Sequence, residues 1–73
     1  MDLEAWSSRL KVFADATRVR LLVLLAGEEL TVAELSSITQ LAQPRVSTHL
    51  AKLKEAGLLR DRRAAVSAYY RFD

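Results

Sequence analysis

Hydrophobic residues recur every three or four positions through the first part of the chain, a spacing that predicts amphipathic helices. The first such stripe consists of Leu3, Trp6, Leu10 and Phe13. The following segment, around residues 18–25, is apolar on nearly all sides, so we expect it to be the central core helix. Asp15 is placed to cap its N-terminus, and Gly27 is placed to end it as a C′ residue.

A third helix is predicted from residue 31. The run Thr31-Val32-Ala33-Glu34 matches the capping box, in which the Thr31 hydroxyl serves a backbone amide and the Glu34 side chain reaches back. The helix that begins there carries Val32, Leu35 and Ile38, and its pattern fades over residues 39–41.

A fourth helix is predicted around Pro44, which fits a first helical turn because its missing N–H costs nothing there. Its N-cap is weak, with Ala42 or Gln43 where Ser or Asp is usual. The helix runs to residue 55 or 56, and Gly57 supplies a left-handed stop.

After Gly57 the hydrophobic period changes to two, which predicts two β-strands at residues 59–62 and 66–72. One face of the second strand holds Val66, Ala68, Tyr70 and Phe72, and the other holds Ser67, Tyr69 and Arg71. Residues 63–65 join the strands without glycine or asparagine, so we expect a longer, more mobile loop rather than a tight hairpin turn.

The predicted order is therefore α-α-α-α-β-β, a mainly α domain with one β-hairpin, and residues 1–73 make a single domain. The third and fourth helices have helix-turn-helix spacing, and a basic hairpin after them is typical of the wing of a winged helix-turn-helix. On this interpretation residues 43–56 form the recognition helix and residues 60–71 the wing.

The fourth helix divides into two faces at about 100° per residue. Val46, Leu50 and Leu53 fall in one sector and must face the core. The candidate DNA-binding residues lie on the other side or at its flanks, and they are Gln43, Pro44, Arg45, Ser47, Thr48, His49 and Lys52. A face of small, hydroxyl and cationic side chains is what entry into the major groove requires. The alternative is the polar side of an ordinary surface helix.

Each of these side chains has an expected role. Arg45 is the candidate for bidentate recognition of guanine, and Gln43 for adenine or the backbone. Ser47 and Thr48 suit a phosphate or a thymine methyl group, and Lys52 suits a phosphate. His49 lies at the boundary of the two faces, where a packing or capping role competes with phosphate contact.

The wing adds three cations, Arg60, Arg62 and Arg63. Alternation of side chains puts Arg60 and Arg62 on one side, where they would approach a flanking phosphate or the minor groove. The alternative is that these charges keep an edge strand soluble. We expect Tyr70 to pack on the core and Tyr69 to be a surface residue or a phosphate donor.

The distribution of charge supports a polyanionic partner. The net charge is +2. Residues 1–40 hold four basic against six acidic side chains, whereas residues 41–73 hold seven against three. With no cysteine and one histidine, these residues offer no metal site or cofactor site of the usual kind. No apolar run has the length of a membrane span, and the start lacks a basic signal segment, so we expect a cytoplasmic protein.

Taken together, these motifs resemble the ArsR-like (arsenic-repressor) family of bacterial winged-helix regulators. The similar stretches are residues 13–22, 43–50, 53–59 and 69–71. The resemblance implies a homodimer that binds double-stranded DNA, represses transcription and often releases DNA on binding an inducer.

Three departures from the family pattern change what the resemblance implies. The cysteines of metal-sensing members are missing from the helix at residues 32–38, so metal sensing is not carried over. Ala64 and Ala65 stand where the wing turn usually has a glycine. The C-terminal dimerisation helix of the family is absent after Asp73, so we expect an N-terminal fragment of a longer protein, for example one fused to a methyltransferase domain.

Two rival functions stay open. A protein-interaction or dimerisation module would leave the stripe of the first helix, Leu3, Trp6 and Leu10, exposed in a monomer and would bind another chain there. The alternative is that this stripe packs on the core of its own domain. The same residues are the expected homodimer interface. An enzyme has less support, because there is no glycine-rich phosphate loop, no cysteine partner for His49 and no paired catalytic carboxylates.

Overall fold

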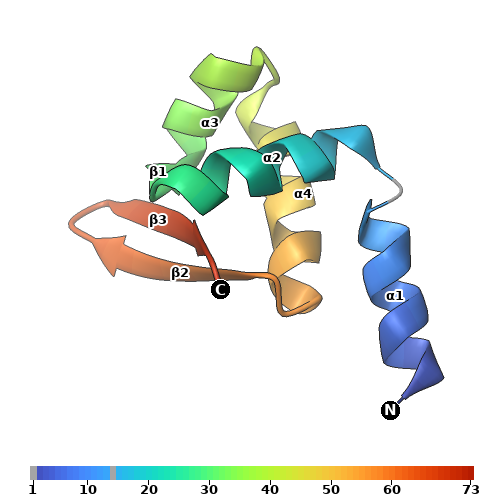
Figure 1. Ribbon diagram of the computed structural model, residues 1–73. Coiled ribbons are helices and arrows are strands. Elements are labelled where there is room, and N and C mark those ends of the chain that lie inside the picture. Colours follow the sequence, from blue (N-terminus) through green and yellow to red (C-terminus); the bar gives the residue numbers. More distant parts are fainter. Residues whose placement is uncertain (1, 14) are drawn as a thin grey trace.

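The computed structural model describes residues 2–13 and 15–73, and the side chains of residues 8, 9, 12 and 13 lie outside that description. In chain order the elements are α1 (Leu3–Phe13), α2 (Ala16–Gly27), β1 (Leu30–Thr31), α3 (Val32–Thr39), α4 (Gln43–Glu55), β2 (Leu59–Ala64) and β3 (Ser67–Phe72) (Figure 1). The predicted fold class is confirmed, and the order gains one short strand, β1.

Local sequence signals set most helix ends. Asp15 Oδ1 accepts hydrogen bonds from the backbone amides of Thr17 (2.9 Å) and Arg18 (3.3 Å), which caps α2. Thr31 and Glu34 form the complete capping box of α3. Gly57 follows α4 with a φ of 79°, as predicted. The prediction for Gly27 is wrong, because α2 includes this residue and ends at the extended Glu28 without a left-handed position.

The unpredicted strand β1 completes a three-stranded antiparallel sheet in the order β1-β3-β2. Leu30 pairs with Tyr70 at one edge, and Leu59 pairs with Phe72 at the other. A strand of two residues is too short to show the alternation of hydrophobic and polar positions. Its partner strand also lies some forty positions away in the chain. The sequence therefore predicts the hairpin but not its third strand.

The wing turn also differs from the prediction. Ala64 pairs with Ser67, so only Ala65 and Val66 lie between the strands, and the longer loop that we expected is wrong. Ala65 has a φ of 54°. A positive φ at the first position alone is the pattern of a type II′ turn, which matches the twist of a hairpin. Alanine adopts this conformation at a steric cost, and the six paired positions of the ladder hold it there.

The core lies where α2, α3, α4 and the sheet meet. Its buried side chains are Leu21, Leu22, Leu25, Leu30, Leu35, Val46, Leu50, Leu53 and Leu59. Helix α2 contacts α1, α4 and β3, as expected of the central helix. Its outward side is nevertheless open, since Val19 and Val23 are exposed. Tyr70 packs against the core from β3, as predicted.

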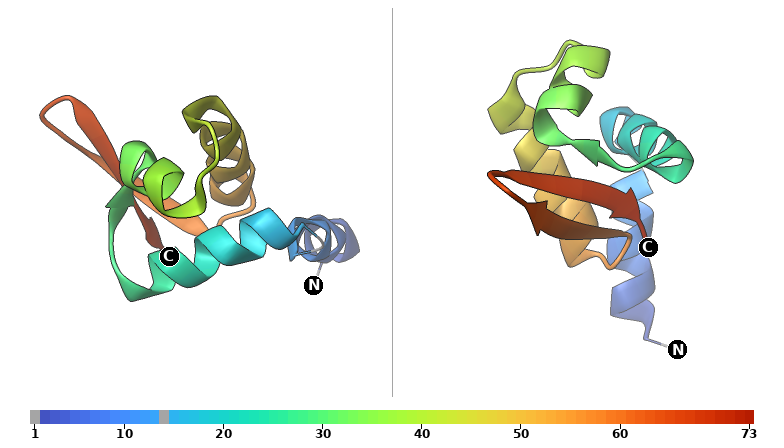
Figure 2. Two further views of the ribbon diagram at one scale, coloured as in Figure 1. Left: turned by 90° about the horizontal axis from the view of Figure 1, so that it is seen from above. Right: turned by 90° about the vertical axis from the view of Figure 1, so that its left-hand side faces the viewer.

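Helix α1 packs on α2 and extends away from the other elements, on the side opposite the hairpin (Figures 1 and 2). The extents of 38 × 23 × 21 Å reflect this arm. Three residues of the predicted stripe are exposed, with 80% of Leu3, 46% of Trp6 and 63% of Leu10 accessible. The fourth, Phe13, has its side chain outside the described part. Among the described residues, no helix is long and apolar enough to cross a membrane.

Candidate nucleic-acid interface

Helix α4 is fixed by one buried face. Val46, Leu50 and Leu53 are each fully buried, and the helix contacts α2, α3 and β2. Its N-cap Ala42 makes no side-chain hydrogen bond, and the amides of Arg45 and Val46 instead donate to the Ala42 carbonyl at 3.0 and 3.1 Å. Packing of the apolar face, rather than the weak cap, therefore holds the helix in place.

The opposite face of α4 is open to solvent. Every candidate residue on it is exposed except His49, which is half-buried, and the exposed ones are Gln43, Pro44, Arg45, Ser47, Thr48 and Lys52. Within residues 2–13 and 15–73, Arg45 and Lys52 have no carboxylate within 4.0 Å. The Thr48 hydroxyl donates to the Pro44 carbonyl at 3.0 Å. The two cations are thus available to a ligand without breaking an ion pair.

His49 links the recognition helix to α2. The Arg18 Nε group donates to His49 Nδ1 at 3.2 Å, so Nδ1 is an acceptor and the ring proton belongs on Nε2. Asp15, the cap of α2, lies near both residues. Partial burial raises the pKa of Asp15, but the amides of Arg18 and Thr17 and the charge of Arg18 lower it below its ordinary value. The packing role of His49 therefore has a specific partner, which sequence reasoning missed because it lies 31 positions away.

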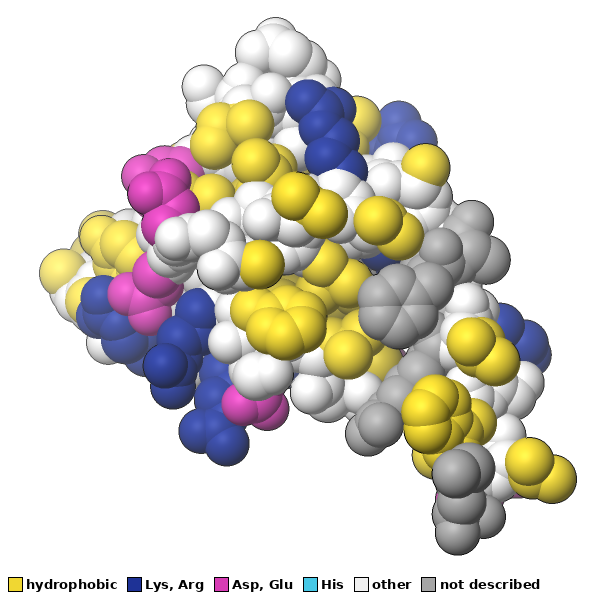
Figure 3. All heavy atoms as spheres, viewed as in Figure 1, with side chains coloured by type: hydrophobic (Ala, Val, Ile, Leu, Met, Phe, Trp, Pro, Cys, Tyr) yellow, Lys and Arg dark blue, Asp and Glu magenta, His cyan; other side chains and the backbone are white. Residues whose placement is uncertain are grey.

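The wing cations are held differently. Arg60 Nε lies 2.7 Å from Asp73 Oδ1, and Arg62 makes a bidentate ion pair with Glu29. The Arg62 guanidinium also lies over the ring of Tyr69, with Cζ 4.7 Å from the ring centroid. Arg63 has no carboxylate within 4.0 Å among the described side chains. Figure 3 shows basic and acidic side chains interleaved over the hairpin.

One ion pair joins α4 to the hairpin. Lys54, near the end of α4, lies 2.7 Å from Asp61 of β2. The hydrogen bond with Lys54 lowers the pKa of Asp61 despite its partial burial, and the same bond raises the pKa of Lys54. This contact ties the base of the wing to the recognition helix.

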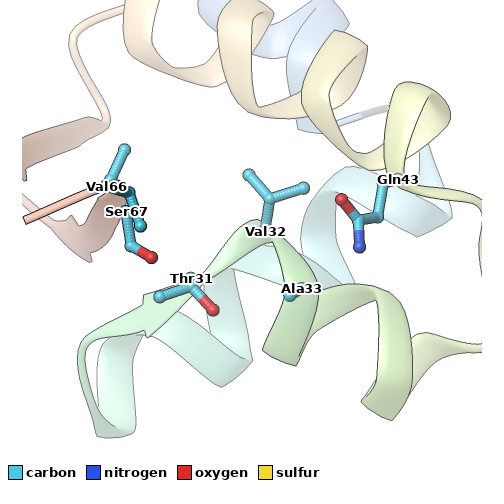
Figure 4. A pocket seen from close by; sticks show the side chains of 7 residues that line it. Thr31, Val32, Ala33, Gln43, Val66 and Ser67 are labelled. Carbon is cyan, nitrogen blue, oxygen red and sulfur yellow. The ribbon is translucent and has the colours of Figure 1, made fainter.

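A shallow hollow of about 210 Å³ separates the wing turn from the helices. It is lined by the start of α3, by Gln43 at the start of α4, and by the wing residues Val66, Ser67 and Ala68 (Figure 4). Seen from above, the hairpin and α4 lie on either side of α3, and both extend away from α2 (Figure 2). The wing turn and the beginning of the recognition helix therefore flank one open surface.

Helices α3 and α4 followed by an antiparallel hairpin define the winged helix-turn-helix class. A family model described as bacterial regulatory protein, arsR family, matches residues 15–61. The chain belongs to this family.

Two curated relatives and one solved structure show the extent of the similarity. The arsenic resistance transcriptional regulator ArsR1 of Pseudomonas putida is 52% identical over 84% of this chain and 48% of its own length. The arsenical resistance operon repressor of Escherichia coli is 42% identical over 84% of this chain and 53% of its own length. The chain thus spans about half the length of the curated relatives it matches.

The solved structure is the homodimeric winged helix-turn-helix DNA-binding domain (fragment 1–100) Mb0332 of Mycobacterium bovis, a possible ArsR-family regulator. It superposes with a TM-score of 0.91 at 31% identity, over 96% of this chain and 65% of that one. Both the helices and the hairpin are therefore shared with a protein described as a homodimer.

Proposed function

We propose that this chain is the sequence-specific, double-stranded DNA-binding domain of a transcriptional repressor. The observation that carries the proposal is the exposed face of α4, where Arg45 and Lys52 have no carboxylate partner among the described residues. On the second helix of a helix-turn-helix, this face is the one that enters the major groove.

Within this proposal Arg45 discriminates bases by a bidentate contact with guanine, and Gln43, close to the wing, contacts adenine or the backbone. Pro44, Ser47 and Thr48 allow close approach, and Lys52 binds phosphate. His49 keeps its packing bond to Arg18 and has Nε2 left to donate to a phosphate.

Four residues of the wing support binding to the flanking backbone, either by contact with phosphate or by holding the wing in position: Arg60, Arg62, Arg63 and Tyr69. Arg63 has no ion-pair partner to give up in the described part of the chain, whereas Arg60 and Arg62 are paired with Asp73 and Glu29. We expect removal of Arg62 to weaken binding to every sequence.

We also propose that the chain pairs as a homodimer through Leu3, Trp6 and Leu10. Support comes from their exposure on a helix that projects from the domain and from the homodimeric state of the similar Mycobacterium bovis domain. Sedimentation at several concentrations, with Trp6→Ala compared against Lys11→Ala on the same helix, tests this. Association that Trp6→Ala leaves unchanged would remove α1 from the interface.

The test of function is selection from a random duplex library near physiological salt, followed by sequencing of the retained DNA. An enriched palindrome means a specific dimer, and its half-site spacing follows directly. A single enriched half-site means a DNA reader that binds as a monomer. Retention without enrichment that disappears as salt rises would overturn sequence-specific binding and leave the protein-interaction module as the function to test.

A further inference from the structure

Arg62 lies across all the strands of the sheet on its outward face. It starts on the edge strand β2 and is paired in register with Tyr69 of the central strand β3. Its guanidinium stacks over the Tyr69 ring and reaches Glu29, the residue directly before β1. One side chain therefore connects both edges of the sheet.

The pair with Glu29 uses the guanidinium edge that a phosphate would use. Arg62 Nε lies 2.9 and 3.0 Å from the two carboxylate oxygens of Glu29, and Nη2 lies 2.6 Å from Oε1. Bidentate geometry of this kind is what arginine offers to carboxylates and phosphates alike. The bond with Arg62 lowers the pKa of Glu29, with a smaller contribution from Arg71, so Glu29 stays ionised at neutral pH.

The outer part of the wing needs such a tie, because Tyr70 and the Lys54–Asp61 pair hold the hairpin only to the core and to the end of α4. Among the described residues none of the wing (60–71) is buried, and the one buried residue of β2 is Leu59 at its start. Strand β1 contributes only two paired positions to the sheet. A hairpin on its own is marginally stable in water.

We infer that Arg62 is a positioning residue, which locks the wing against the turn before β1 instead of binding phosphate, with Glu29 and Tyr69 as its partners. The inference rests on the proposed DNA-binding function, since a fixed wing angle matters where the wing turn and α4 must meet one duplex. Arg62 then contributes to affinity through the geometry of residues 63–67.

The effect of Glu29→Gln on DNA affinity distinguishes the two roles of Arg62, because a phosphate contact and a positioning role predict changes in opposite directions. If Arg62 contacted phosphate, Glu29 would be a competitor, and Glu29→Gln would tighten binding to DNA. If Arg62 positions the wing, Glu29→Gln weakens binding although it removes a negative charge. Glu28→Gln is the matched control, because Glu28 is an exposed neighbour with no ion pair in the described part of the chain.

The experiment measures affinity for the selected duplex across a salt series for Glu29→Gln, Arg62→Gln, Arg62→Lys and the double variant. We expect each single change to weaken binding about 2- to 5-fold, the range that exposed ion pairs span. We expect the double variant to be no weaker than Arg62→Gln alone, because both changes break one contact. Arg62→Lys does not rescue binding, since lysine offers neither the bidentate edge nor the stacked plane.

The salt dependence of DNA binding also distinguishes the two possible roles of Arg62, as a phosphate contact or as a positioning residue. Arg62→Gln leaves the slope of log Kd against log salt unchanged, whereas loss of a phosphate contact reduces it by about 1. Tighter binding by Glu29→Gln, together with a reduced slope for Arg62→Gln, would overturn the inference.

A second readout does not depend on DNA. Backbone order parameters at residues 63–67 should fall from about 0.85, typical of rigid backbone, towards the flexible range below about 0.6 in Glu29→Gln and Arg62→Gln, but not in Glu28→Gln. If the wild-type chain binds no DNA, the proposed function fails and this measurement still decides whether the tie exists. Unchanged order parameters in both variants would refute it.

Discussion

The recognition helix and the wing flank the same open surface, but they are held in opposite ways. On α4 the residues that anchor the element and the residues that face outward are separate, with Val46, Leu50 and Leu53 fully buried and Arg45 and Lys52 exposed. On the wing the cations Arg60 and Arg62 are themselves tied to carboxylates. The buried face of α4 anchors that helix without its outward cations, whereas on the wing two outward cations also help to hold the strands in place.

The largest difference in stability should appear between a buried residue of α4 and an exposed residue of the wing turn. Leu50→Ala should lower the free energy of unfolding by about 2–5 kcal/mol, because it deletes fully buried methyl groups and leaves a cavity. A domain this small has little stability to lose, so we expect the variant to be largely unfolded. Urea titration followed by circular dichroism measures the effect. Val66→Ala at the wing turn, where the side chain is 94% exposed, should stay within about 0.5 kcal/mol.

The second comparison concerns DNA recognition. Arg45→Ala should cost about 1–3 kcal/mol of discrimination at one base pair and leave the free energy of unfolding nearly unchanged. Lys52→Ala should instead weaken binding to all sequences and lower the salt slope by about 1. Repeating the duplex selection with each variant separates the two roles. Identical selected motifs for wild type and Arg45→Ala would show that α4 does not read the sequence through this residue.

The sequence predicts α4 better than the wing, because local patterns define the helix whereas contacts between distant residues hold the hairpin. The stripe of Val46, Leu50 and Leu53, the capping box at Thr31 and the stop at Gly57 are local signals, and the structure confirms each of them. The candidate reading face of α4 follows from the same period as the buried face, so its exposure could be predicted as well.

The misses are of two kinds. Strand β1 and the pairs of Glu29 with Arg62 and of Arg18 with His49 join residues 31 to 40 positions apart, so no local pattern reveals them. The wing turn and Gly27 show the converse, where tertiary context overrides local preference. The paired ladder forces Ala65 to a positive φ, and α2 ends without using the freedom of its glycine.

That forced turn gives a third, smaller prediction, specific to the wing. Ala65→Gly should raise the free energy of unfolding by about 0.5–1 kcal/mol, because relief of the left-handed penalty exceeds the added freedom of the unfolded chain. Ala64→Gly, one residue earlier in the paired strand, should lower it by about the same amount. Thermal or urea unfolding of the two variants checks the signs. If both glycines destabilised, the turn would not hold Ala65 at a positive φ in solution.

The smallest expected effect is the loss of folding stability in acid. It should involve the ion pairs of the wing but not Arg45 and Lys52, the exposed cations that form the reading face of α4. The ion pairs hold the pKa values of Glu29 and Asp61 below their ordinary values of 4.5 and 3.8. A group whose pKa is lowered by folding contributes stability above its unfolded pKa and loses it as pH falls through the folded pKa. The wing should therefore keep its full contribution above about pH 5 and lose it progressively at lower pH.

Urea titrations at a series of pH values test this, with Arg62→Gln and Lys54→Gln as the variants that remove the two partners. Each should flatten the acid decline in stability, because the carboxylate left behind no longer differs as much between the folded and unfolded chain. Arg45→Gln, which removes an equal charge from α4 where no carboxylate lies within 4.0 Å among the described residues, should leave the decline as it is in wild type. Equal flattening by all three would mean that the acid response follows net charge alone, and the distinction between a tied wing and an untied reading face would then fail.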